Sequence, residues 1–401
     1  AEPWLGRAGA TPVTSWLRAK AELARGHHGR AAAWWSDALR RVPEPAAPEG
    51  LVASLYVGSS WPETPARAVR RLRGERGALR LARGDFTGAL DDFLRSGHWT
   101  DAAYVAERVL TVEELKDVTD GVWREPAPLD DRPAPAEPDE LREVRAKLRN
   151  LLARRLVRME RGDEAAAYFS AALRSVHQRL QRYLLAGQNE SLPPEMRARA
   201  WYGGAHLVRT RGLELLATEL DPDWALLDGR GVGDLTADFR ATNAHFRLVR
   251  PGDAELARAR SHAPEPDRRF HYRYRAAGLA WAAAELLPDG DAAAGLLDAG
   301  GRWLMHRDPD AADSFYKRLV GRGRATALGE AADRQRWFPP LDAAGRPFIT
   351  RHPPPGPAAE AAPAPPQAGA DESELLGDTG SLPSATEAAC SDGLTGGALP
   401  E

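Results

Sequence analysis

The stretch from Glu75 to Leu110, ERGALRLARGDFTGALDDFLRSGHWTDAAYVAERVL, decides the fold class of this chain. Three segments with apolar residues at helical spacing follow one another, and breaks at Gly84-Asp85 and Gly97-His98 separate them. Glycine favours the end of a helix, while a polar residue favours the start of the next. The stretch therefore predicts short helices that follow one another closely. Looser versions of the same pattern recur along the chain.

Composition supports an all-α fold. The 401-residue chain is 43% hydrophobic and 28% charged, which is typical of soluble globular proteins. Strand formers are scarce, whereas Ala, Leu, Arg and Glu dominate and favour helices. From Pro353 to Glu401 there are eight acidic and no basic residues; since the whole chain carries −3, the remainder carries +5. We interpret this stretch as a disordered or extended solubilising tail, with association between tail and body, or a weakly anionic partner of the body, as the alternatives.

Proline-rich segments divide the chain into regions. Residues 124–139, REPAPLDDRPAPAEPD, predict an exposed and semi-rigid acidic linker. We expect an N-terminal helical repeat region over 1–123 and a second helical repeat region over 140–340. A Pro/Ala/Gly-rich acidic tail over 341–401 completes the predicted organisation.

Three predicted helical hairpins carry small and aromatic residues at related spacings. These residues are Ala19, Ala31, Trp35 and Ala38 in the first hairpin, Gly77, Ala89 and Phe93 in the second, and Gly300, Trp303, Ala312 and Tyr316 in the third. The pattern resembles the tetratricopeptide repeat, a helix–turn–helix unit of about 34 residues, and the chain also looks like bacterial helical repeat proteins. The resemblance implies an α-solenoid of stacked antiparallel hairpins, in which these residues pack where helices cross. It further implies a surface that binds a protein or peptide partner.

Two basic stretches are candidate binding surfaces. The predicted helix after the linker carries seven basic residues on the face opposite its apolar residues: Arg142, Arg145, Lys147, Arg149, Arg154, Arg155 and Arg158. Interspersed glutamates and the lack of aromatic residues on that face favour a solvated surface over a site for nucleic acid or anionic lipid.

The second stretch interleaves basic and aromatic residues. Its arginines are Arg268, Arg269, Arg273 and Arg275, and we take them as a candidate surface binding site. Positive charge and ring stacking are what single-stranded nucleic acid requires. However, Phe270, Tyr274 and Trp281 share one helical face, so we favour a core segment with arginines at its rim.

The sequence predicts no catalytic, cofactor-binding or metal-binding residues. The ten histidines form no HExxH motif, and Cys390, the single cysteine, lies in the predicted tail. GxSxG is absent, and the glycine-rich residues 228–234 match neither GxGxxG nor a P-loop. No apolar run reaches about 18 residues, so no membrane span is predicted. The start Ala-Glu-Pro is compatible with signal-peptidase cleavage, and we favour an exported, periplasmic location over a cytoplasmic one, with a trimmed chain as the alternative.

These observations favour a non-enzymatic scaffold or adaptor that binds a protein or peptide, alone or within a larger complex. One alternative is an exported enzyme or ligand-binding protein on a helical shell, for example one that acts on cell-wall glycans. That alternative requires two or more convergent carboxylates in a deep pocket. Binding of single-stranded nucleic acid through residues 268–275 ranks last.

Overall fold

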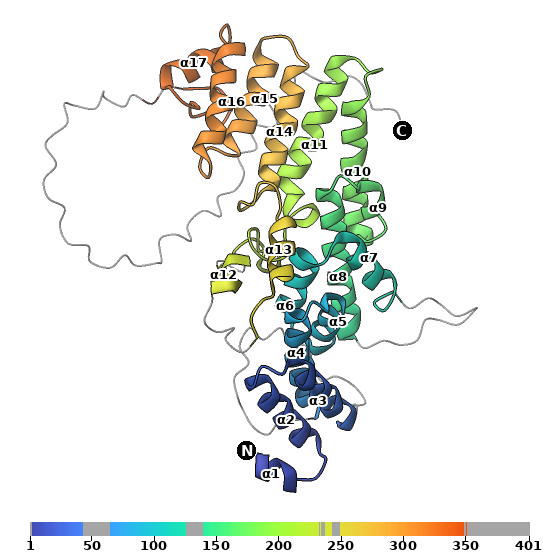
Figure 1. Cartoon of the computed structure of the whole chain (residues 1–401). Coiled ribbons are helices and arrows are strands. Elements are labelled where there is room, and N and C mark those ends of the chain that lie inside the picture. Colours follow the sequence, from blue (N-terminus) through green and yellow to red (C-terminus); the bar gives the residue numbers. More distant parts are fainter. Residues whose placement is uncertain are drawn as a thin grey trace, which may run out of the picture. The chain divides into compact units, whose positions relative to one another are not determined.

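A computed structural model of the chain shows an all-helical protein (Figure 1). The structure describes residues 2–42, 65–125, 139–231, 233, 237–242, 249–348 and 350. Within these ranges the secondary structure is helical except for one isolated antiparallel bridge between Leu341 and Pro347. The predicted all-α class is therefore confirmed. Most of the predicted linker and all of the tail after residue 350 lie outside the described residues.

The chain forms two compact units. Unit 1 comprises residues 1–181 and 210–272, and unit 2 comprises residues 182–209 and 273–401. Both sides of the proline-rich segment 124–139 thus belong to unit 1.

The helices of unit 1 are α1 (Glu2–Arg7), α2 (Pro12–Ala24), α3 (His28–Arg41), α4 (Pro65–Ala82), α5 (Phe86–Ser96), α6 (Trp99–Tyr104), the π-helix η1 (Val105–Val109), α7 (Val112–Asp120), α8 (Asp139–Arg158), α9 (Gly162–Ala165), the 3₁₀ helix η2 (Ala225–Leu227), α12 (Ala237–Thr242) and α13 (Asp253–Ser261). Those of unit 2 are α15 (Asp291–Arg302), α16 (Pro309–Arg322) and α17 (Ala327–Gln335). Helices α10 (Ala171–Gln188), α11 (Pro194–Leu215) and α14 (Tyr272–Glu285) contribute residues to both units.

Local sequence signals set several helix ends. Thr111 and Glu114 stand at the spacing of a capping box, and α7 begins with one: Thr111 accepts a hydrogen bond from the Glu114 N–H, and the Glu114 carboxylate accepts one from the Thr111 N–H. Asp308 caps α16 by accepting from the Ala311 N–H at 3.0 Å, as its position before a proline predicts. Gly97 ends α5 with φ of 75°, a left-handed conformation that glycine adopts at low cost.

Small residues allow close packing within the helical hairpins. Ala19, Ala31 and Trp35 are buried in one apolar cluster of α2, α3 and α4. The Glu75 carboxylate of α4 accepts a hydrogen bond from Trp35 Nε1 at 3.1 Å and a charged one from Lys20 at 2.8 Å. The two contacts connect the α2–α3 hairpin to the next helix.

Glycines do the same work in two further hairpins. A Cβ built on Gly77 of α4 would lie 2.9 Å from the Phe93 ring of α5, and one on Gly300 of α15 would lie 2.7 Å from the Phe315 ring of α16. Real Cβ atoms do not approach so closely, so a side chain at either position would force the phenylalanine ring or the helices to shift.

Two sequence-based expectations about helices are wrong in detail. The apolar spacing from Trp99 to Leu110 predicts a regular helix, but residues 105–109 form a π-helix. Phe270 has φ of 57° and precedes α14, so it does not share a helical face with Tyr274. In both places backbone geometry follows tertiary contacts described below rather than local spacing.

Candidate functional site

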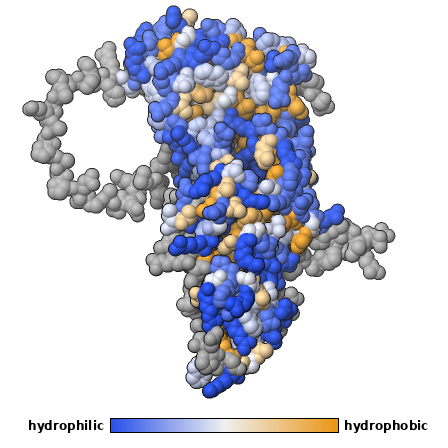
Figure 2. Space-filling view, in the orientation of Figure 1, coloured by the Kyte–Doolittle hydropathy of each residue, from blue (hydrophilic) through white to orange (hydrophobic). Residues whose placement is uncertain are grey.

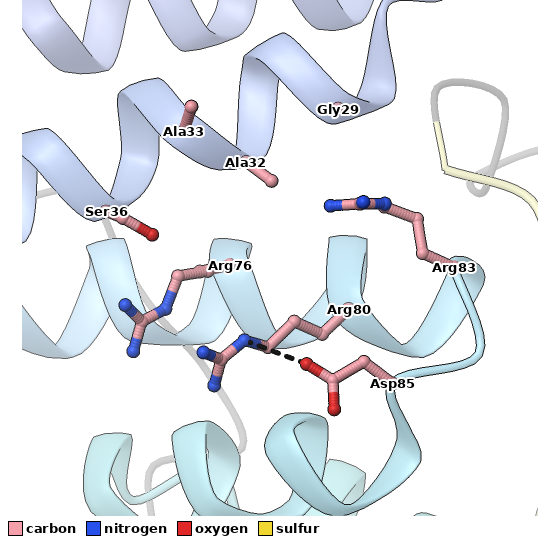
Figure 3. A pocket seen from close by; sticks show the side chains of 8 residues that line it. All are labelled: Gly29, Ala32, Ala33, Ser36, Arg76, Arg80, Arg83 and Asp85. Carbon is pink, nitrogen blue, oxygen red and sulfur yellow. Dashed lines mark ion pairs between the residues drawn. The ribbon is translucent and has the colours of Figure 1, made fainter.

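A pocket of about 360 Å³ lies between α3 and α4 and reaches the turn into α5 (Figure 3). Its lining residues are Gly29, Ala32, Ala33, Ser36, Arg76, Arg80, Arg83 and Asp85. The α3 side thus presents small side chains and one hydroxyl, while the α4 side presents three arginines. In Figure 3 the Arg83 side chain extends toward Gly29 and Ala32 of α3.

Asp92 of α5 holds two of these arginines in place. Its carboxylate is fully buried and accepts from Arg76 through Nε at 2.7 Å and Nη2 at 2.6 Å, a bidentate pair. Arg80 Nη1 lies 3.0 Å from the same carboxylate, and Arg73 Nη1 lies 4.0 Å from it. One carboxylate therefore faces three guanidinium groups.

The remaining charges of the pocket do not cancel. The Asp85 carboxylate caps α5 by accepting from the Gly88 N–H at 3.1 Å, and Arg80 Nε lies 3.3 Å from it. Arg83 is exposed and has no ion-pair partner among the residues that the structure describes. With Arg73 included, four arginines face two aspartates, so the cluster carries a net charge of +2. Such a cavity is suited to bind an anionic group.

A second group of charges lies inside unit 1, around the π-helix η1. The Glu107 carboxylate forms an ion pair with Arg158 of α8 and accepts from the backbone N–H of Glu219 at 2.8 Å. Burial raises the pKa of Glu107, but Arg158 and Arg154 outweigh it and hold that pKa below its ordinary value. The hydrogen bond thereby joins the π-helix η1 to Glu219, which lies 112 positions after Glu107 in the sequence.

Arg154 of α8 forms the next pair of this network. It makes an ion pair with Glu219 and donates to the Ala217 carbonyl at 3.1 Å. The second oxygen of Glu219 accepts from Trp99 Nε1 at 2.7 Å. Arg154 and Glu219 are both buried.

Backbone carbonyls satisfy the third arginine of α8. Arg155 Nη1 donates to the carbonyl oxygens of Ala106 at 2.5 Å and Leu110 at 2.9 Å. A π-helix leaves carbonyls at its end without intrahelical partners, and a buried guanidinium supplies the donors. Burial lowers the pKa of Arg155 to about 10, although Glu107 acts in the opposite direction.

An aspartate and a histidine complete the buried network. Asp223 accepts from the backbone N–H groups of Thr218, at 3.0 Å, and Phe270, and its Oδ2 lies 2.7 Å from Nδ1 of His271. Burial raises the pKa of Asp223, but these partners, His271 foremost, outweigh it and lower that pKa. The contact with the Phe270 N–H accounts for the left-handed residue before α14.

This network is a structural connection rather than an open site. Its carboxylates are buried and already engaged by arginines or N–H groups. The solvated face predicted for α8 is therefore wrong for Arg154 and Arg155, which are buried. Periodicity failed because guanidinium groups that meet carboxylates and carbonyls can be buried.

The boundary between the two units falls within the predicted basic–aromatic stretch. Arg268 and Arg269 belong to unit 1, whereas Arg273 and Arg275 belong to unit 2. Arg268 is exposed and the other three are half-buried. Arg269 donates to the Gly229 carbonyl and lies over the Phe270 ring at 5.1 Å.

The structure buries most of the residues assigned to repeat packing. These are Ala19, Ala31, Trp35, Ala38, Gly77, Ala89, Phe93, Gly300 and Ala312, while Trp303 and Tyr316 are half-buried. None of these residues lines the arginine pocket, although some of them lie on the same helices, α3 and α4.

In the described ranges no group of three or more His, Cys, Asp or Glu side chains is placed to hold a metal ion. Of the helices that the structure describes, none combines the length and apolarity needed to cross a bilayer. Hydrophilic residues dominate the face in Figure 2, with apolar residues scattered among them. Comparison with known proteins found no matching family model, no similar curated protein and no similar solved structure.

Sequence reasoning missed the pocket arginines. Arg76, Arg80 and Arg83 recur at spacings of four and three, which places them on one helical face. That spacing was a usable signal. The surplus of positive charge could not be predicted from the sequence, because it depends on which arginines the buried Asp92 neutralises.

Proposed function

We propose that this chain is a non-enzymatic helical scaffold, built as a tetratricopeptide-like stack of hairpins, that binds a partner protein through an anionic group seated in the α3–α4 pocket. One observation carries the proposal: the pocket presents more arginine charge than its own aspartates neutralise. A +2 cavity attracts anions and accelerates their association. The small residues of α3 leave room for a main chain to approach.

The alternative of a glycan-cleaving enzyme finds less support. Hydrolysis of glycosidic bonds uses two carboxyl groups on either side of the bond. The described pocket is lined by a single carboxylate, Asp85, which already caps α5. Binding of an anion requires only the donors that the pocket has.

The test compares partner binding by the full-length chain and by Arg83→Glu. Proteins that the wild-type chain retains from the native cell, with crosslinking, are identified and one of them is purified. Its affinity is then measured against both chains by calorimetry. Arg336→Glu is the matched control, since it makes the same change in charge at a side chain that is 82% exposed and lies outside the pocket. Partner binding that survives Arg83→Glu unchanged would rule out the proposed surface.

A further inference from the structure

The hydrogen-bond donors of the pocket arginines are only partly used. Arg76 spends Nε and Nη2 on Asp92, which leaves its Nη1. Arg80 spends Nη1 on Asp92 and the Gly88 carbonyl and directs Nε to Asp85, which leaves its Nη2. Arg83 keeps its whole guanidinium group, with no acceptor among the described residues. Three neighbouring arginines thus retain N–H groups, and Ser36 adds a hydroxyl from α3.

Charge and geometry together select the kind of anion. A carboxylate carries one negative charge and two acceptor oxygens, which would leave part of the +2 surplus uncompensated. A phosphoryl group on a side chain carries about −1.5 to −2 at neutral pH and three acceptor oxygens. Guanidinium groups bind such oxygens in bidentate fashion, and several can share one phosphate.

Space in the pocket fits a phosphoryl group that is attached to a larger molecule. The cavity of about 360 Å³ exceeds what one phosphoryl group fills. On the α3 side, a Cβ added to Gly29 would meet nothing within 4 Å, so this wall is open. Ala32 and Ala33 contribute only methyl groups. An extended segment of a partner therefore has room along α3 while its phosphate contacts α4.

We propose that the α3–α4 pocket is a binding site for a phosphoryl dianion, carried by a phosphorylated side chain of the partner. The inference rests on the proposed scaffold function and names the chemistry that its pocket recognises. Arg83 is the principal contact, because its donors are free. Arg76 and Arg80 line the same pocket, and Asp92 holds their guanidinium groups toward α5, so they add positive charge behind Arg83 (Figure 3). Free phosphate offers the same chemistry from another source, and the experiment separates the two.

The experiment uses the full-length chain and three fluorescent peptide pools with degenerate flanking residues. The pools carry phosphoserine, glutamate or serine at the fixed central position, and binding is measured by fluorescence anisotropy. We expect the phosphoserine pool to bind at least about tenfold more tightly than the glutamate pool. Arg83→Glu should remove that preference, while Arg336→Glu, which makes the same change in charge outside the pocket, should keep it.

Two further arms identify the anion and its source. Between pH 7.5 and pH 5.5 the phosphoserine pool should lose affinity, since its second pKa lies near 6, and the glutamate pool corrects for titration of the protein itself. Inorganic phosphate should compete in the millimolar range. If inorganic phosphate competes as strongly as the unlabelled peptide, the proposal that a partner's side chain carries the phosphoryl group is wrong, and the pocket is a site for free phosphate.

The outcomes separate this inference from the proposed function. If the glutamate and phosphoserine pools bind equally and both depend on Arg83, the proposed preference for a phosphoryl dianion is wrong, and the proposal of an anion-binding scaffold stands. If no pool binds and inorganic phosphate has no effect, the phosphoryl site is wrong. A purified protein partner that still requires Arg83 would preserve the scaffold function even then.

Discussion

Unit 1 uses arginine in two opposite ways, and the contrast separates structure from function. Around η1, Arg154, Arg155 and Arg158 are buried or nearly so, and each donates to carboxylates or backbone carbonyls, although Nε of Arg154 is buried without an acceptor. In the α3–α4 pocket, Arg83 is exposed and donors of Arg76 and Arg80 remain unspent. Buried charges that are fully paired fix a conformation, whereas unpaired charges in a cavity are available to a ligand.

Loss of Arg158 should have the largest effect on stability. Arg158→Met leaves the buried Glu107 carboxylate without its ion pair and removes the donor that Arg158 supplies to the Leu216 carbonyl, while the Ala217 carbonyl keeps Arg154 as a donor. We expect the free energy of unfolding to fall by about 3–5 kcal/mol, measured by urea denaturation. Anion binding at the pocket should not change in the folded fraction.

A double variant checks that the loss comes from an uncompensated charge. Glu107→Leu combined with Arg158→Met removes both partners and should recover part of the stability, because no buried carboxylate is then left unpaired. A double variant less stable than Arg158→Met would show that the π-helix itself, rather than the ion pair, requires these groups.

Asp92→Asn should have the next largest effect and should act on both properties at once. Asn has the shape of aspartate but no charge, so Arg73, Arg76 and Arg80 lose their shared counter-ion. We expect a loss of about 2 kcal/mol in the free energy of unfolding. Binding of the phosphoserine pool should tighten, because the net charge of the pocket rises from +2 to +3. Weaker binding would mean that Asp92 matters chiefly by positioning the arginines.

The acid sensitivity of the η1 region offers a smaller effect. His262 Nδ1 lies 2.9 Å from the Arg108 carbonyl, and burial, with Arg155 and Arg258 nearby, lowers the pKa of His262 below 6.5. Below pH 6.5 the unfolded chain therefore takes up a proton that the folded chain does not, so stability falls as pH falls and is unaffected above 6.5. Between pH 7.5 and pH 5.5 we expect the free energy of unfolding of the wild-type chain to fall by about 1 kcal/mol more than that of His262→Asn.

His177 is also buried, and burial lowers its pKa, so it contributes to the acid sensitivity of both proteins. The difference between wild type and His262→Asn therefore isolates His262. Urea denaturation at each pH gives the two slopes. Parallel slopes for wild type and His262→Asn would assign the acid sensitivity to other groups. Glu107, with its lowered pKa, loses its contribution at lower pH, below about 4.5, and so falls outside this window.

Local chemistry made part of this fold predictable. Thr111 with Glu114, and Asp308 before Pro309, determine helix starts through contacts within four residues, and such contacts are legible in sequence. Gly203 shows that close packing can also be predicted from sequence. A glycine within a helix indicates a close neighbour, and a Cβ there would lie 2.7 Å from the Tyr183 ring. The all-α class followed from such signals.

The buried network was not predictable, because its contacts join distant residues. Glu107 and Glu219 are 112 positions apart, and neither alone distinguishes a buried carboxylate from a solvated one. Periodicity assigned Arg154 and Arg155 to solvent on the premise that charges avoid the interior. The pocket escaped notice for a related reason: the same arginine pattern describes a solvated helix face or an anion site, depending on Asp92 of the next helix.

Arg83→Gln should have the smallest effect on stability and the clearest effect on binding. The side chain is exposed and no described residue pairs with it, so the free energy of unfolding should change by less than about 0.5 kcal/mol. Affinity for the phosphoserine pool should nevertheless fall about tenfold, measured by anisotropy. Arg158→Met should show the reverse, with large destabilisation and unchanged anion affinity. Because the two variants remove the same side chain from one unit, that inversion distinguishes arginines that hold the fold from arginines that serve a ligand, and equal effects on stability would remove the distinction.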